Sequence, residues 1–190
     1  MDKNEFLEFL RKSKENIEAS RVREQAFFEK LARALQTLVF EQYPEYQSKQ
    51  NKVSELLHEK SLLCASKVLD ALGMAIYNQK NKISFNTKSK IIKPQTREES
   101  EKELQELINL YPNADIEYLK QVHWESFYER QRPALFHSCI HNKSKEILVE
   151  FYEDDILELS ADGLRQIDST IFYLAVCPFV EDFFECVNLS

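Results

Sequence analysis

The chain has 190 residues, of which 43% are hydrophobic and 12% aromatic, a composition typical of a folded protein and not of a disordered one. It contains only two glycines, Gly73 and Gly163, which excludes the glycine-rich dinucleotide loop, the P-loop and the nucleophile elbow. The net charge is −7 and unevenly distributed: residues 146–190 hold eleven acidic side chains against Arg165 alone, which leaves +3 for the first 145 residues.

The N-terminal region has the pattern of an amphipathic helix. Apolar residues from Phe6 to Leu38 recur at three- and four-residue spacing. Few of them fall within residues 13–25, so we expect that part to be exposed, and a bend there would divide the helix in two. Pro44 ends the element, because proline lacks an amide donor and restricts the residue before it. Residues 1–44 are therefore predicted to include an N-terminal helical extension.

A second helix is predicted over residues 53–77, with an apolar stripe of Leu62, Ala65, Leu69, Leu72 and Ile76. Extended backwards by four residues, this stripe reaches His58, which we therefore expect to face inward. No acidic residue lies between Ala71 and Arg97, whereas six basic ones do, counting Arg97 itself. Residues 79–95 are accordingly predicted to form a basic linker or loop, with a short β-hairpin near residues 82–93 as an alternative.

The second half of the chain again shows helical patterns. Thr96 and Glu99 form the Thr-x-x-Glu capping box that begins a helix, and a further helix is predicted over residues 116–127. Pro133 suits a first helical turn, so we expect the chain to restart there. Residues 146–159 fit either a helix or a strand, and we favour the helix. The last helix should run over residues 164–187, with a kink or break at Pro178.

These elements predict a mainly α protein, an irregular bundle of about five or six helices in a single domain over residues 1–190. The start of the chain has no apolar leader, and the longest apolar run, residues 171–180, has half of the about 20 residues that cross a bilayer. The four cysteines are scattered in apolar surroundings, which is typical of core residues in a reducing compartment. We therefore expect a cytoplasmic protein without a membrane segment.

The histidines offer one chemical hypothesis. His137 and His141 are four residues apart, so both lie on one face of a helix, and His58 is a candidate for the third ligand. One histidine on an early helix facing a His-x-x-x-His pair on a later one resembles the DinB-like helical bundles. The resemblance implies a three-histidine site for zinc or another divalent transition metal.

Arg132 and His137 offer a second hypothesis, because the spacing Arg-x-x-x-x-His resembles the signature of the HEPN family of helical ribonucleases. The resemblance implies that the arginine and the histidine act on a scissile phosphate. Chemically, a guanidinium stabilises the negative charge that develops on the phosphate, while an imidazole transfers a proton.

The charge distribution supports a third hypothesis, which we favour: a non-enzymatic inhibitor or regulatory protein. An acidic C-terminal surface attracts a basic protein partner and repels the phosphates of nucleic acid. Aromatic residues near arginines are typical of binding hot spots. The candidate partner-binding residues are Trp124, Tyr128, Glu153, Asp154, Asp155 and Glu158. The oligomeric state stays open.

Overall fold

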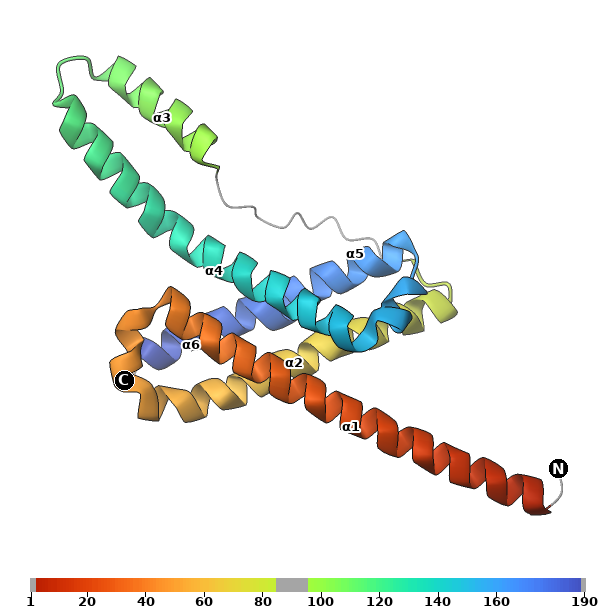
Figure 1. The fold of residues 1–190 in the computed structure, drawn as a ribbon. Coiled ribbons are helices and arrows are strands. Elements are labelled where there is room, and N and C mark those ends of the chain that lie inside the picture. Colours follow the sequence, from red (N-terminus) through yellow and green to blue (C-terminus); the bar gives the residue numbers. More distant parts are fainter. Residues whose placement is uncertain (1–2, 85–95, 189–190) are drawn as a thin grey trace.

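The computed structural model describes residues 3–84 and 96–188, without the side chains at 3, 48–53, 128–131 and 186–188 (Figure 1). The described elements are, in chain order, α1 (Lys3–Gln42), the 3-10 helix η1 (Pro44–Lys49), α2 (Gln50–Lys80), α3 (Arg97–Leu110), α4 (Ile116–Leu157), α5 (Ala161–Thr170), the π-helix η2 (Ile171–Val176) and α6 (Cys177–Asn188). The prediction of a mainly α fold is confirmed. The described part of the chain contains no strand, and the hairpin predicted near residues 82–93 falls mostly on residues 85–95, outside that part.

Helix α1 is continuous, and the bend that residues 13–25 allowed does not occur. This stretch contains neither glycine nor proline, and ion pairs within the helix support it: Arg11 contacts Glu8 and Glu15 at 2.7 and 2.6 Å. No side chain from residue 4 to residue 26 is buried, and Phe27 is the first with no exposed surface. The first half of α1 therefore projects from the bundle, whereas the second half packs within it (Figure 1).

The core lies between α1, α2, the second half of α4 and the C-terminal segments. Four aliphatic or aromatic residues of α1 are completely buried in it: Phe27, Leu31, Leu35 and Val39. Helix α2 contributes mostly small side chains, which let α1 and α2 approach closely: Ala65, Val68, Ala71 and Ala75. Helix α4 and the C-terminal segments close the core with Phe136, Ile140, Ile171, Val176 and Phe183.

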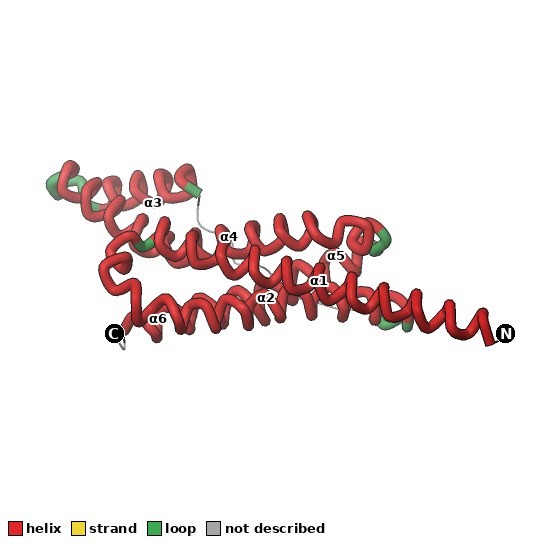
Figure 2. The backbone as a smooth tube through the Cα atoms, turned by 60° about the horizontal axis from the view of Figure 1, so that its bottom comes forward, coloured by secondary structure: helices red, strands yellow, loops and turns green. Residues whose placement is uncertain are grey.

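Helices α3 and α4 form a hairpin whose start is the predicted capping box. Glu99 N donates to Thr96 Oγ1 at 3.2 Å, and Thr96 N donates to the Glu99 carboxylate at 2.8 Å. Because both amides are satisfied, α3 begins at Arg97 as the sequence indicates. The hairpin of α3 and the first half of α4 projects at the end of the bundle opposite the projecting half of α1 (Figures 1 and 2).

Three helical patterns in the sequence join into α4, so the predicted restart at Pro133 is wrong: this proline lies inside the helix. A proline within a helix loses one hydrogen bond, but Phe136 and Ile140 just after it are fully buried and hold the helix against the core. Helix α4 departs from helical geometry at Tyr152, whose φ and ψ are −135° and 30°. Residues 146–159 are mostly helical, as predicted, and include the α4 C-terminus.

The predicted kink before Pro178 takes the form of the π-helix η2. Proline has no amide hydrogen and its ring presses on the carbonyl four residues earlier. The wider turn of a π-helix gives that carbonyl more room, and Cys177 N accordingly donates to Phe172 O, five residues back.

Candidate functional site

His137 and His141 lie on one face of α4, as predicted, and this face meets η2. The ring centroid of Phe172 lies 5.7 Å from that of His141 and 6.1 Å from that of His137. His137 Nδ1 lies 2.8 Å from Pro133 O, and His141 Nε2 lies 3.2 Å from Asp168 O. A carbonyl oxygen only accepts, so each of these nitrogens carries a hydrogen and donates it.

His141 ties α4 to α5, because its acceptor Asp168 O belongs to α5. Burial of the ring lowers the pKa of His141, the Asp168 carboxylate opposes this shift, and Lys145 adds to it. The hydrogen bond to Asp168 O also opposes the shift, but burial outweighs both effects of Asp168, so the pKa stays below its ordinary value and the neutral imidazole is favoured.

His58 does not face inward as predicted; it is exposed, and its Nδ1 lies 3.1 Å from Gln36 Nε2 of α1. The apolar stripe that led to it follows one edge of the buried face of α2. The centre of that face runs through Leu57, Cys64, Val68, Ala71 and Ala75. Several of these residues are small, so they contribute little to a hydrophobic pattern although they are completely buried.

The histidines at 58, 137 and 141 therefore do not converge. His58 contacts α1, whereas His137 and His141 face η2. Among the side chains that the structure describes, no three histidines, cysteines or carboxylates gather in a way that would hold a metal ion. The three-histidine arrangement implied by the DinB-like resemblance is thus not formed in this part of the chain.

Arg132 and His137 also point to different neighbours. The Arg132 guanidinium donates to Gln42 O at 2.9 Å, pairs with Glu45 at 2.7 Å and lies 4.1 Å from the centroid of the Tyr43 ring. It thus binds the C-terminal end of α1, while His137 faces η2. Five residues separate the two along α4, about 140° around the helix axis. Within one chain they do not form the joint phosphate site that the HEPN resemblance implies.

Trp124 lies within the α3–α4 hairpin and is partly buried. Its ring centroid is 5.5 Å from that of Phe127, and the Arg97 guanidinium of α3 stacks over it at 5.5 Å. Next to it, the buried His123 places Nε2 2.9 Å from Ser100 Oγ and 3.0 Å from Ser100 O. Trp124 therefore helps to hold α3 on α4, and the side chain of Tyr128, its predicted companion, lies outside what the structure describes.

The C-terminal acidic residues are only partly available to a partner. Six of the eleven pair with bases of the same chain: Glu146 with Lys143, Glu150 with Lys30, Asp155 with Arg23, Asp162 with Arg165, Asp168 with Lys145, and Asp182 with Lys60. Glu153, Asp154 and Glu158, at the C-terminal end of α4, are exposed and form no ion pair with any described residue. We call these three carboxylates the acidic end of α4.

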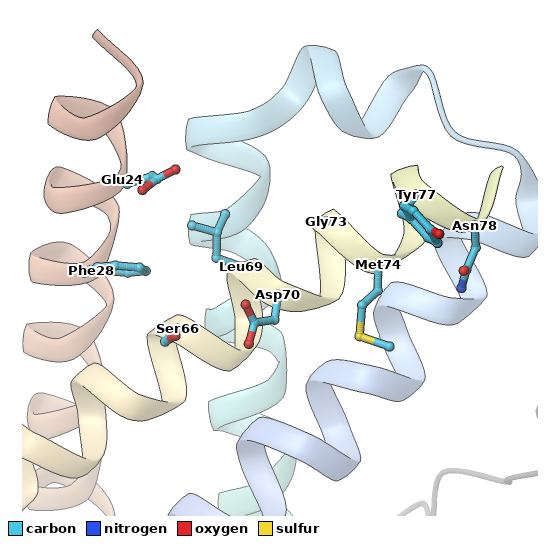
Figure 3. Close-up of a pocket in the computed structure, with 9 residues that line it drawn as sticks. All are labelled: Glu24, Phe28, Ser66, Leu69, Asp70, Gly73, Met74, Tyr77 and Asn78. Atoms are coloured by element: carbon cyan, nitrogen blue, oxygen red, sulfur yellow. The ribbon is translucent and has the colours of Figure 1, made fainter. Parts of the chain in front are cut away.

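A groove of about 760 Å³ runs between α1 and α2 on the outside of the bundle, and we call it the α1/α2 groove (Figure 3). In Figure 3, Glu24 and Phe28 leave α1 on the side that faces Leu69 of α2. The full lining is Glu24, Phe28, Ser66, Leu69, Asp70, Gly73, Met74, Tyr77 and Asn78. It combines an apolar floor with two carboxylates, and none of these nine residues is basic.

Gly73 borders open space in the groove, because a Cβ atom built at this position meets no other atom within 4 Å. Met74 and Tyr77 beside it are 43% and 62% exposed, so apolar surface stays accessible along this part of α2. The groove also ends near the acidic end of α4, since Gln79, next to Asn78, donates from Nε2 to Glu158 O at 3.0 Å.

The α1/α2 groove is not among the sites predicted from the sequence. A signal was present, because Gly73 lies within a predicted helix between large side chains such as Leu72 and Met74, and a glycine among large side chains suggests a gap on that helix. What the sequence does not state is that α1 lies alongside and forms the second wall.

Comparison of the chain with protein-family models, with curated proteins and with solved structures gives no match. Among the described helices, none is apolar over a stretch long enough to cross a lipid bilayer.

Proposed function

We propose that this protein is a non-enzymatic regulatory protein that binds a basic, amphipathic helical segment of a partner protein in the α1/α2 groove. The observation that supports the proposal is a groove with apolar walls whose nine lining residues include Glu24 and Asp70 but no base. An amphipathic helix lying in such a groove buries its apolar face and keeps its charged face at the rim.

Charge favours a basic segment over an acidic one. Glu24 lies at one wall of the groove and Asp70 at the other, where Lys67 is 3.5 Å from its carboxylate. The acidic end of α4 extends the negative charge beyond the end of the groove at Asn78. Complementary charge of this kind accelerates association and rejects partners of the wrong sign more than it adds affinity.

Apolar contact supplies the affinity. Phe28 and Leu69 are partly buried in the groove and Met74 is nearly half exposed, so a bound helix removes their remaining surface from water. Methionine suits this role because its unbranched, polarisable side chain adapts to different partners.

The test uses two designed helical peptides that share one leucine face and carry either lysine or glutamate on the polar face. Fluorescence anisotropy is expected to show binding of the lysine peptide, weaker binding as ionic strength rises, and no binding of the glutamate peptide. Equal binding of both peptides, or none of the lysine peptide at millimolar concentration, would contradict the proposal.

The Gly73→Lys variant tests whether the peptide binds in the groove and not elsewhere on the surface. A Cβ atom at this position meets no other atom within 4 Å, and the lysine side chain adds a positive charge beside Glu24 and Asp70, so affinity for the lysine peptide should fall by about tenfold or more. Asp154→Lys at the acidic end of α4 should weaken binding less, and mainly at low salt. Glu117→Lys, the same charge change on the distant α3–α4 hairpin, is the matched control and should leave binding unchanged.

A further inference from the structure

The projecting half of α1 carries an apolar stripe that continues the buried face of the same helix. Phe6, Leu10 and Ile17 lie on the line that leads to Phe27 and Leu31, at alternating steps of about three and four residues. The residues that complete the repeat between them are Ser13, Ser20 and Glu24. At Phe27 and Leu31 this line is buried in the core, and before Phe27 no residue on it is buried.

The exposed surface of this stripe is large for one helix. Phe6, Leu10 and Ile17 are 46%, 46% and 55% exposed, and Leu7 and Phe9 beside them are 53% and 58% exposed. Scattered apolar residues are normal on a protein surface, but five gathered on one side of a projecting helix form a contiguous patch of the kind that marks an interaction site.

Charge identifies the occupant. The segment from Lys3 to Glu18 contains four basic and four acidic residues, so it neither attracts an anionic membrane nor repels a second copy of itself. Several of these charges are already paired along the helix: Arg11 with Glu8 and Glu15, Lys12 with Glu8, and Lys14 with Glu18. A partner therefore needs apolar complementarity and no compensating charge.

The stripe is complementary to itself when two copies run antiparallel. If Phe6 of one copy faces Ile17 of the second copy, Leu10 faces Ser13 by the same register, so a large side chain meets a small one in each inner layer. Ser13 Oγ donates to Phe9 O at 2.8 Å in its own helix, so its hydroxyl is already satisfied when it is buried.

The same register covers the flanking apolar residues. Leu7 comes to lie beside the aliphatic part of Lys14 of the second copy, and Phe9 beside Asn16. All five exposed apolar residues are thus covered by one arrangement, and no pair of like charges faces across the seam.

From this geometry we infer that two copies of the chain associate through an antiparallel pair of α1 helices, formed by residues 3–20 of each. The seam ends before Glu24, the first residue of the α1/α2 groove, so both grooves stay open in the dimer. The inference stands on the apolar stripe and not on the function proposed for the groove.

Multi-angle light scattering and sedimentation equilibrium test the association. The wild-type chain of 22.5 kDa is expected to behave as a dimer at micromolar concentration. Leu10→Glu combined with Ile17→Glu should raise the dimer dissociation constant by at least about 100-fold, since it places charges in the apolar seam of both copies. Both positions lie outside the core, so circular dichroism should show an intact bundle.

Val22→Glu is the matched control, because Val22 is 69% exposed on the same helix and lies about 140° around the axis from Ile17. It should leave the dimer unchanged. A wild-type chain that stays monomeric at high concentration, or a dimer that survives the double substitution, overturns the inference. So does a chain that is monomeric in solution but sediments with anionic phospholipid vesicles.

Disulfide trapping tests the orientation. Protein with Phe6→Cys and protein with Ile17→Cys are mixed and oxidised in air, and the expected product is the mixed disulfide between positions 6 and 17. Predominant formation of the disulfide between two copies of the Phe6→Cys protein indicates a parallel pair and overturns the antiparallel arrangement.

Discussion

Gly73 and Gly163 both lie in helices, but the space around them differs. A Cβ atom at position 73 meets nothing within 4 Å, whereas at position 163 it lies 3.3 Å from Leu159 Cβ. Gly73→Ala is therefore expected to raise the free energy of unfolding by about 0.5–1 kcal/mol, because alanine has less backbone freedom to lose on folding. Gly163→Ala should yield a smaller gain or a loss, because Leu159 must shift. Urea unfolding of both variants measures the difference.

At His141, protonation couples stability to pH. Its pKa in the folded protein is lowered from the ordinary value of 6.5, chiefly by burial, so the unfolded chain binds a proton more readily. Stability contributed by the neutral ring is present above pH 6.5 and is lost as pH falls through the folded pKa. Urea unfolding at pH 7.5 and at pH 5.5 should show a loss that is smaller in His141→Gln.

The pH experiment has an internal control. His58 is exposed on α2, and His58→Gln should retain the wild-type difference between the two pH values. If His141→Gln also retains it, the loss arises from carboxylates and not from this ring.

The buried thiol of Cys64 should be inert in the folded protein. Burial raises the pKa of Cys64 to about 12, and only the thiolate attacks a disulfide reagent. Cys139 and Cys177 are partly exposed, and burial raises the pKa of Cys177, so Cys139 should react before Cys177 and Cys64 with Ellman's reagent at pH 8. Cys64→Ala is therefore expected to leave the fast phase of labelling unchanged, and Cys139→Ala to reduce it. A fast phase that disappears with Cys64→Ala would contradict the buried position.

At the scale of elements, the α3–α4 hairpin depends on a few local contacts. Its buried residues are few, and the capping box at Thr96 and Glu99 fixes where α3 begins. Thr96→Ala removes the hydroxyl that accepts from Glu99 N and should destabilise α3 by about 1 kcal/mol. Hydrogen exchange is expected to accelerate in α3 while the core of α1 and α2 stays protected.

Thr96→Ser is the control for this cap, because serine keeps the accepting oxygen. Hydrogen exchange in α3 should stay as slow in this variant as in the wild-type chain. Faster exchange throughout the molecule in Thr96→Ala would mean that the hairpin and the bundle unfold together.

Pro133 and Pro178 show that the same residue has different effects in different surroundings. Pro133 lies within α4, where Phe136 and Ile140 hold the helix to the core. Pro178 follows the π-helix η2, whose wider turn gives the Leu174 carbonyl room. The sequence indicates a perturbation at each proline, but the packing on both sides decides whether the helix continues, restarts or widens.

For the whole molecule, the two halves of α1 have separate roles. The first fully buried residue is Phe27, so removal of residues 3–20 should leave the bundle folded. At low protein concentration the full and shortened chains are expected to unfold at the same temperature. At high concentration only the full chain should gain thermal stability, because association stabilises the folded state by mass action. Differential scanning fluorimetry over a range of concentrations makes the comparison.

The sequence by itself determined the helical character, most helix boundaries and the start of α3, because these depend on periodicity and on contacts between near neighbours. It also showed that His137 and His141 share a face, since four residues nearly complete one helical turn. Only the tertiary structure decided that His58 faces outward, that Arg132 binds the end of α1, and that several C-terminal carboxylates are paired with lysines and arginines far away in the chain. The tertiary structure also decided the α1/α2 groove. Its two walls come from residues that are far apart in the chain, and they form a groove only because α1 and α2 lie side by side. The physical reason is that local backbone geometry follows from adjacent residues, whereas burial, charge pairing and cavities depend on which helices meet.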